Sequence, residues 1–195
     1  MTRYAYRVRA GSQILPLGGA LTTRSQLARY TVTPAASTAT AVKAAIALTA
    51  SAQPTVTAGI TSPAVPRCLS VTGNAGGIAG NVVITGTDMA GAAITDTIAL
   101  SGSSTVAGSK AFATVTSIAY PAETNAGTDT VSIGTTDKLG LPAMLPHNTV
   151  ERVFYNNVLE GTAATVTVSS TVLSSNTVDL NTALAGAIVD VYLFV

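Results

Sequence analysis

The chain has 195 residues, enough for a single domain whose hydrophobic core needs neither disulfides nor a metal. Charged residues make up only 10% of it, against roughly 25% in an average soluble protein, and the mean hydropathy is +0.45. A chain of this composition is expected to expose an apolar surface, which a membrane or another protein must cover. A spanning helix needs about 20 mostly apolar residues in a row. The longest charge-free stretch, residues 44–66, is interrupted by prolines and hydroxyl side chains. The composition therefore favours burial in a protein assembly.

Charge is unevenly distributed along the chain. Residues 1–87 contain seven Lys or Arg and no acidic residue, whereas residues 88–195 contain three basic and nine acidic residues. The two parts thus carry +7 and −6, which gives the net charge of +1. Because the arginines are scattered and the net charge is small, the pattern does not indicate nucleic-acid binding. It indicates either a solvated arm or, as we favour, a basic segment that lies on an acidic neighbour.

Residues 1–60 are predicted to form an extended N-terminal arm and an Ala- and Thr-rich connector. Tyrosine and valine alternate with arginine over residues 3–9, which is the period of a β-strand. Residues 41–48 fit either a short helix or a strand-like connector. We expect the arm to be an assembly element that acts through Arg3, Tyr4, Tyr6, Arg7, Arg9, Arg24 and Arg29.

Residues 61–195 are predicted to form an all-β domain, an antiparallel β-sandwich or jelly-roll-like barrel, with less than about one-fifth helix in the chain. Glycine- and serine-rich turns at 73–80, 88–91 and 101–104 separate short alternating segments. Residues 134–148 are expected to be a loop. Strands are expected at 67–72, 81–86, 93–100, 111–119, 129–133, 149–156, 164–169, 177–180 and 187–195.

The chain ends in an apolar strand whose last residues are Tyr192, Leu193, Phe194 and Val195. An unpaired apolar strand would invite aggregation. We therefore expect this strand to be central in a sheet or paired with another subunit.

Residues that usually carry catalysis or bind metals are scarce. His147 lies in a loop pattern without an obvious acid partner, and we expect it to be buried or bonded at an interface. Cys68 excludes an internal disulfide framework and is expected to be buried. Asp88, Asp96, Asp129 and Asp137 could meet at loop ends to bind calcium, but no calcium-loop motif is present. We therefore expect no enzyme activity, no catalytic residue, no cofactor and no metal.

Four blocks in residues 67–195 resemble small β-rich structural proteins of tailed-bacteriophage virions, of the capsid-associated or decoration type. The blocks are GNVVITGTDMAGAAITDTIAL, KAFATVTSIAYPAETNAGTDTVSIGTTDKLGLP, LPHNTVERVFYNN and SSNTVDLNTALAGAIVDVYLFV. The resemblance implies a virion component that is assembled in the host cytoplasm. It carries over no catalytic residue.

The leading hypothesis from sequence is a capsid decoration, or cement, protein that clamps neighbouring capsomers. Its expected partners are other copies of itself, as a homo-oligomer and most simply a trimer, and the major capsid protein or another virion protein. No nucleic acid and no membrane are expected as partners. The alternatives are a tail tube, head–tail connector or baseplate component, and a host- or glycan-binding β-sandwich on the particle surface.

Overall fold

The structure is a computed structural model that describes residues 13–14, 22–23, 26–51, 53, 55–123 and 127–195. Within them the chain forms strands and a single short 3-10 turn, η1 (Leu173–Ser175). The strands are β1 (Gln13–Ile14), β2 (Thr22–Thr23), β3 (Leu27–Val32), β4 (Lys43–Ala47), β5 (Arg67–Gly73), β6 (Asn81–Thr87), β7 (Ala93–Ala99), β8 (Thr105–Phe112), β9 (Thr114–Ala119), β10 (Thr130–Gly140), β11 (Val150–Tyr155), β12 (Val158–Leu159), β13 (Thr165–Thr167), β14 (Thr177–Asp179) and β15 (Val189–Phe194). All pairings are antiparallel, which confirms the all-β prediction.

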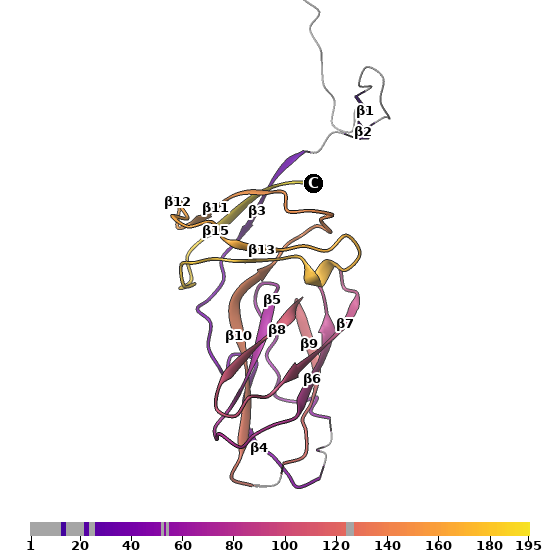
Figure 1. Cartoon of the computed structure of the whole chain (residues 1–195), viewed down its shortest axis with the longest axis vertical. Coiled ribbons are helices and arrows are strands. Elements are labelled where there is room, and N and C mark those ends of the chain that lie inside the picture. The colour runs from indigo at the N-terminus through magenta and orange to yellow at the C-terminus, as the bar shows by residue number, and fades with distance from the viewer. Residues whose placement is uncertain (1–12, 15–21, 24–25, 52, 54, 124–126) are drawn as a thin grey trace, which may run out of the picture.

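The lower half of the molecule in Figure 1, which we call the barrel body, consists of two facing sheets. One contains β8, β5, the first half of β10, and β4, and the other has the order β7-β6-β9. Alternating residues of these strands point inward, as a pleated strand requires. Leu69, Val82, Ile84, Phe112 and Ile133 are fully buried between the sheets.

A buried carboxylate joins the two sheets of the barrel body where no strand ladder does. Asp96 of β7 accepts backbone N–H bonds from Ser109 (2.8 Å) and Lys110 (3.1 Å) of β8. Gly108 makes this approach possible, because a Cβ there would lie 2.5 Å from the Asp96 carboxylate. The carboxylate thus satisfies edge N–H groups that a continuous ladder would otherwise use.

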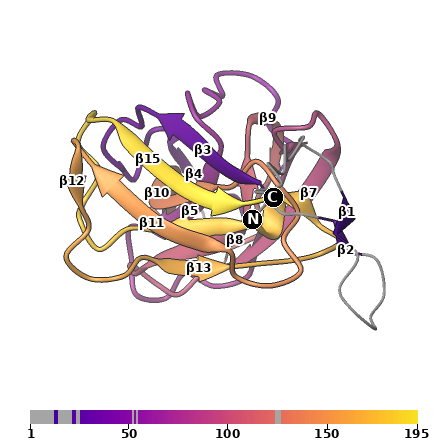
Figure 2. The same ribbon diagram turned by 90° about the horizontal axis from the view of Figure 1, so that it is seen from above.

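The upper half, which we call the apical module (residues 26–34 and 138–195), has its own core. A four-stranded sheet of order β12-β11-β15-β3 lies across the top of the molecule, as Figure 2 shows from above. Beneath it run β13, β14 and the end of β10. Leu139, Val178, Val189, Val191 and Leu193 are fully buried between these layers.

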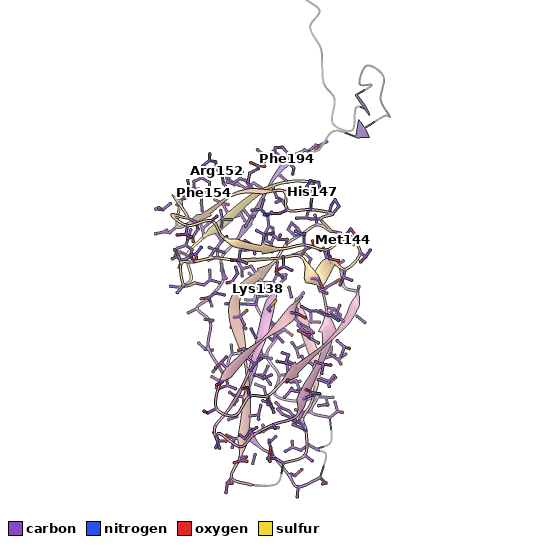
Figure 3. All side chains as sticks on the ribbon, in the orientation of Figure 1. Lys138, Met144, His147, Arg152, Phe154 and Phe194 are labelled. Atoms are coloured by element: carbon purple, nitrogen blue, oxygen red, sulfur yellow. The ribbon has the colours of Figure 1, made fainter. Side chains whose placement is uncertain are left out.

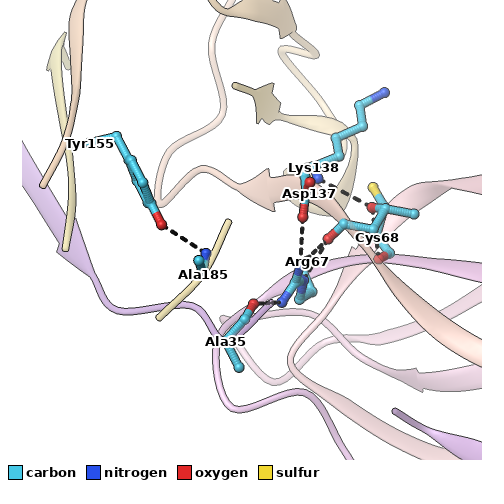
Figure 4. A network of polar contacts seen from close by, with 8 residues as sticks. Ala35, Arg67, Cys68, Asp137, Lys138, Tyr155 and Ala185 are labelled. Atoms are coloured by element: carbon cyan, nitrogen blue, oxygen red, sulfur yellow. Dashed lines mark hydrogen bonds and ion pairs between the residues drawn. The ribbon is translucent and has the colours of Figure 1, made fainter. Parts of the chain in front are cut away.

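Strand β10 and the side chain of Arg67 connect the two halves. The eleven residues of β10 pair with β4 and β5 in the barrel body and with β14 in the apical module. Arg67 is only 3% exposed, and it donates hydrogen bonds to the carbonyls of Thr136 (2.7 Å from Nε) and Ala35 (2.8 Å from Nη1). Its Nη2 lies 3.4 Å from Asp137 (Figure 4). These bonds hold the connector after β3 against the centre of β10.

Several sequence-based predictions agree with the structure. Cys68 is fully buried, and the turns at 88–91 and 101–104 close as expected through Gly91 N–H to the Asp88 carbonyl (3.0 Å) and Ser104 N–H to the Ser101 carbonyl (3.0 Å). The last strand, β15, lies between β11 and β3, which is one of the two positions expected for it.

Other predictions differ from the structure. The expected loop at 134–148 begins too early, because β10 continues to Gly140 with a shift of register between Thr135 and Leu139. The expected strand at 111–119 is two strands, since the chain turns at Ala113 from one sheet of the barrel body to the other. His147 is exposed rather than buried in the single chain.

The predicted boundary of the arm near residue 60 is not a structural boundary. Strand β3 pairs along its whole length with β15, and β4 pairs with β10. The physical reason is the alternation in β3: Ala28, Tyr30 and Val32 pack against the apical core while their neighbours face solvent. The basic composition of this stretch suggested an arm, but its period of two places it in a sheet.

Candidate assembly surface

The apical sheet has one face on the core and one face open to solvent. In an antiparallel sheet, residues directly opposite each other share a face. The register pairs Arg152 with Tyr192 and Tyr192 with Arg29, and these side chains therefore point away from Val191 and Leu193. We call the outward set the apical face; it comprises Leu27, Arg29, Thr31, Arg152, Phe154, Asp190, Tyr192 and Phe194.

Aromatic rings form the middle of the apical face. Phe154 and Tyr192 meet edge to face with ring centroids 5.6 Å apart and an interplanar angle of 72°. Phe194 lies opposite Leu27 of β3, whose side chain is 57% exposed. Figure 3 shows Arg152, Phe154 and Phe194 gathered at the top end of the molecule. Such rings can bury a large apolar area against a partner.

The charged groups of the apical face are partly paired within the chain. Thr31 donates a hydrogen bond from its hydroxyl to Asp190, and the Arg29 Nε lies 3.7 Å from the same carboxylate. The pKa of Arg29 is raised, first by its side-chain hydrogen bond with Tyr192 and then by the charge of Asp190. Arg29 therefore stays cationic, and Asp190 neutralises only part of the positive charge that Arg29 and Arg152 bring to this face.

Exposed apolar side chains gather in the apical module and not in the barrel body. Among the described residues, seven large hydrophobic side chains are exposed, and all of them lie in residues 26–34 or 138–195. They are Leu27, Met144, Val158, Leu159, Val172, Ile188 and Val195. Isolated exposed apolar residues are ordinary, but their restriction to one half of a molecule is a mark of an interaction surface.

The residues expected to form an assembly surface fall into three groups. Arg3, Tyr4, Tyr6, Arg7, Arg9 and Arg24 lie outside the described residues. Arg29, Tyr192 and Phe194 come together on the apical face, although they are far apart in sequence. Leu193 points into the core and is fully buried, while Val195 is exposed and its backbone N–H and C=O pair with Gln26.

Sequence reasoning missed five members of the apical face. Four of them, Leu27, Thr31, Arg152 and Phe154, join it because β3 and β11 flank β15, and the fifth, Asp190, lies on β15 opposite Thr31. The alternation in Val150–Tyr155 predicted a strand, but only the pairing of β11 with β15 shows which of its residues share the outer face.

The described residues contain no arrangement typical of a catalytic or metal site. No three His, Cys, Asp or Glu side chains among them lie close enough to hold a metal ion. Asp88 caps its own turn by accepting N–H bonds from Ala90 (2.9 Å) and Ala92 (3.0 Å). The Cys68 thiol is enclosed by the barrel body, and burial raises its pKa to about 12, which keeps it protonated and unreactive at neutral pH.

Two hollows of the described surface lie beside β11 and β12. One, of about 260 Å³, is lined by residues that include Glu151 and Glu160, and the other, of about 450 Å³, by residues that include Tyr155 and Glu160. Glu160 is already engaged, because it accepts the N–H groups of Asn181 (3.1 Å) and Thr182 (3.2 Å). Within the described part of the chain, no helix has both the length and the apolar character needed to cross a bilayer.

Comparison with known proteins gives no relative. No protein-family model, no curated protein and no solved structure matches this chain.

Proposed function

We propose that the protein is a non-catalytic structural subunit of a phage virion and, most specifically, a decoration protein that joins neighbouring capsomers. The apical module makes the contacts with other subunits, and the barrel body projects from them. Copies of the chain associate with one another, most simply as a trimer at three-fold positions of the shell. The virion assignment comes from the sequence resemblance, and the structure supports the part that concerns assembly.

The observation that carries the proposal is the restriction of exposed large hydrophobic side chains to the apical module. A stable protein–protein contact buries roughly 800 Å² on each partner around an apolar centre. The apical face offers such a centre in Phe154, Tyr192 and Phe194, with Arg29 and Arg152 beside it. Aromatic and arginine side chains are the types that dominate interface energies.

The test is the location and copy number of the protein in purified particles. A decoration protein should occur in hundreds of copies, in proportion to the major capsid protein, and should rebind stripped heads. Copy numbers in the tens, with label on the tail, would replace decoration by a connector or tail role. Absence from particles would refute a virion role altogether.

A substitution separates specific binding from incidental association. Replacing Tyr192 by Ser removes the central ring of the apical face, and it should reduce rebinding to stripped heads at least tenfold. The matched control is Thr97→Ser in β7, an exposed position of the barrel body, which should leave rebinding unchanged. Equal rebinding of both variants would place the contact elsewhere.

The apical face also gives one reason to keep a second candidate function, binding of surface glycans. Phe154 and Tyr192 present aromatic rings beside the hydrogen-bonding groups of Arg152 and Asp190. Binding sites for small ligands commonly combine aromatic side chains with a few polar groups in this way. A glycan array with the intact protein tests this candidate. Binding to a defined glycan that Tyr192→Ser abolishes would favour it over decoration.

A further inference from the structure

Strand β3 forms an open edge of the apical sheet. It pairs with β15 on one side, and no strand pairs with its other side within the described chain. Gln26 and Val195 exchange both backbone hydrogen bonds, at 2.9 and 3.0 Å. In an antiparallel ladder these exchanges alternate along the strand. The even-numbered residues from 26 to 32 therefore bond to β15, while Leu27, Arg29 and Thr31 direct their N–H and C=O groups away from the sheet.

Within the described residues, this edge has few of the features that block pairing. Natural edge strands are usually blocked by charged side chains, by proline, by a bulge or by a covering segment. The one charged side chain of β3, Arg29, is engaged by Tyr192 and Asp190 on the outer face of the sheet. The six residues of β3 contain no proline, their register with β15 shows no shift, and Leu27, Arg29 and Thr31 are exposed. Such an edge can take an additional strand, whose main-chain bonds give affinity and whose side chains give specificity.

The edge requires a strand with one apolar and one polar face. An added strand would continue the apical core on its inner side, next to Ala28, Tyr30 and Val32. On its outer side it would lie beside Leu27, Arg29 and Thr31. Residues 3–9 have this pattern, because Tyr4, Tyr6 and Val8 alternate with Arg3, Ala5, Arg7 and Arg9.

We propose that residues 3–7 of a second copy add to the open edge of β3 as an antiparallel strand, with Ala5 opposite Arg29. This register places Arg3 opposite Thr31 and Arg7 opposite Leu27, and so avoids two arginines directly opposite each other. On the core side it sets Tyr6 against the small Ala28 and Tyr4 against Tyr30. The proposal rests on the assembly role argued above and names the acceptor site of the N-terminal segment.

Strand donation from one copy to the next is a head-to-tail contact. Each chain gives residues 3–7 to one neighbour and receives the same segment from another, so that rotation can close the assembly into a ring.

Cysteine cross-linking tests both the register and the donor. One chain carries Ala5→Cys and a second carries Arg29→Cys; directly opposite residues have Cα atoms about 5.5 Å apart, within the range of a disulfide. The native Cys68 is fully buried and should not interfere. Mild oxidation of the mixture should give a covalent dimer containing one chain of each kind. The control, Ala10→Cys with Arg29→Cys, moves the thiol five residues, about 17 Å, along the strand and should give at least tenfold less.

Two outcomes of the cross-linking would overturn the proposal. A yield no higher than that of the control would show that this register is not formed. A second version of the experiment uses a single chain that carries both Ala5→Cys and Arg29→Cys. If its disulfide forms within the monomer, the segment folds onto its own chain. Retention of the protein on particles in either case would leave the decoration function standing, whereas a cross-link without particle binding would refute that function alone.

A backbone substitution gives an independent readout. Proline at position 29 removes an N–H that points away from β15, so Arg29→Pro should keep the apical sheet and abolish the oligomer in light scattering. Arg29→Ala removes the same side chain but keeps the N–H, so the oligomer of the proline variant should dissociate at a concentration at least tenfold higher than that of the alanine variant. A circular dichroism spectrum and a urea transition within 1 M of the parent protein would show that the proline variant is folded. An unchanged oligomer in that folded variant would contradict strand addition.

Discussion

Asn176 provides the sharpest test of the apical packing. Its side chain is fully buried and organises the segment that runs from Ser169 to η1. Oδ1 accepts the N–H groups of Ser169 (2.8 Å) and Leu145 (3.1 Å). Nδ2 is surrounded by three carbonyls, those of Ser169 (2.9 Å), Val172 (2.9 Å) and Leu173 (3.3 Å). Asn176→Asp keeps the shape but replaces the donor by an acceptor.

The expected cost follows from protonation. A charged carboxylate would face three carbonyl oxygens without water, so the introduced group should take up a proton and donate to one of them. The two N–H donors of the amide serve three carbonyls, whereas a protonated carboxyl has one O–H and serves one. Two carbonyls therefore lose this contact, at about 1 kcal/mol each. Holding the group protonated at pH 7 costs up to about 4 kcal/mol, because its ordinary pKa is about 3.9 and each pH unit is worth about 1.4 kcal/mol. We expect a loss of about 4–6 kcal/mol at pH 7.

The loss should depend on pH in a defined direction. The pKa of the introduced carboxyl is raised in the folded state above its unfolded value, so the unfolded state loses its proton first as pH rises. The penalty should therefore shrink to about 2 kcal/mol at pH 4. Urea unfolding of the variant and the parent protein at both pH values measures it.

Asn181→Asp is the matched control. The Asn181 amide also donates to two carbonyls, those of Thr162 (3.1 Å) and Ala163 (3.0 Å), but the residue is exposed and water can replace both bonds. Its loss should stay below about 1 kcal/mol. A loss under 2 kcal/mol for Asn176→Asp at pH 7, or the same loss at pH 4, would refute the reasoning.

Three further predictions concern the junction and the barrel body. Arg67→Met should lower the free energy of unfolding by about 2–4 kcal/mol, since it leaves the carbonyls of Thr136 and Ala35 without donors, and urea unfolding checks this. Tyr120→Phe should be neutral or stabilise by up to about 1 kcal/mol in the same assay, because the buried Tyr120 hydroxyl has no hydrogen-bond partner among the described residues. Burial raises the pKa of Cys68 to about 12, so stability should fall as pH rises from about 8.5, where the unfolded thiol ionises, towards 12. Cys68→Ala should flatten that slope in urea midpoints measured at pH 8, 9.5 and 10.5, and an unchanged slope would contradict it.

The barrel body could largely be predicted from local pattern. Its strands alternate cleanly, and glycine or aspartate marks the turns, as at Asp88–Gly91 between β6 and β7. What sequence could not show is a choice made by long-range packing. The chain passes from β8 to β9 with a single residue, Ala113, and the alternation itself is nearly uninterrupted there. Only the burial of Phe112 in one sheet and of Val115 in the other fixes the corner.

The sequence indicated which types of residue form the candidate surface, but it did not show which residues come together on it. Tyr192 and Phe194 stood out as apolar residues near the end of the chain, and Arg29 as part of a basic segment. Their meeting depends on the pairing of β3 with β15, whose partners are about 160 positions apart in the chain. Arg152 and Phe154 carried no signal of their own, because a charged and an aromatic residue two positions apart occur on many strands.

Low charge content suggested that much of the surface must be covered, and the structure narrows that argument to one half of the molecule. On the barrel body, exposed threonines pair across strands through their hydroxyls: Thr72 with Thr105 at 2.9 Å, and Thr87 with Thr114 at 2.7 Å. Hydroxyl pairs keep a sheet surface polar without charge, and they contribute a few tenths of a kcal/mol each. The barrel body can therefore face water although it carries few charges. The apical module has no such surface over β12 and β15, where Leu159, Tyr192 and Phe194 are outward. Any partner that covers this protein should be sought there.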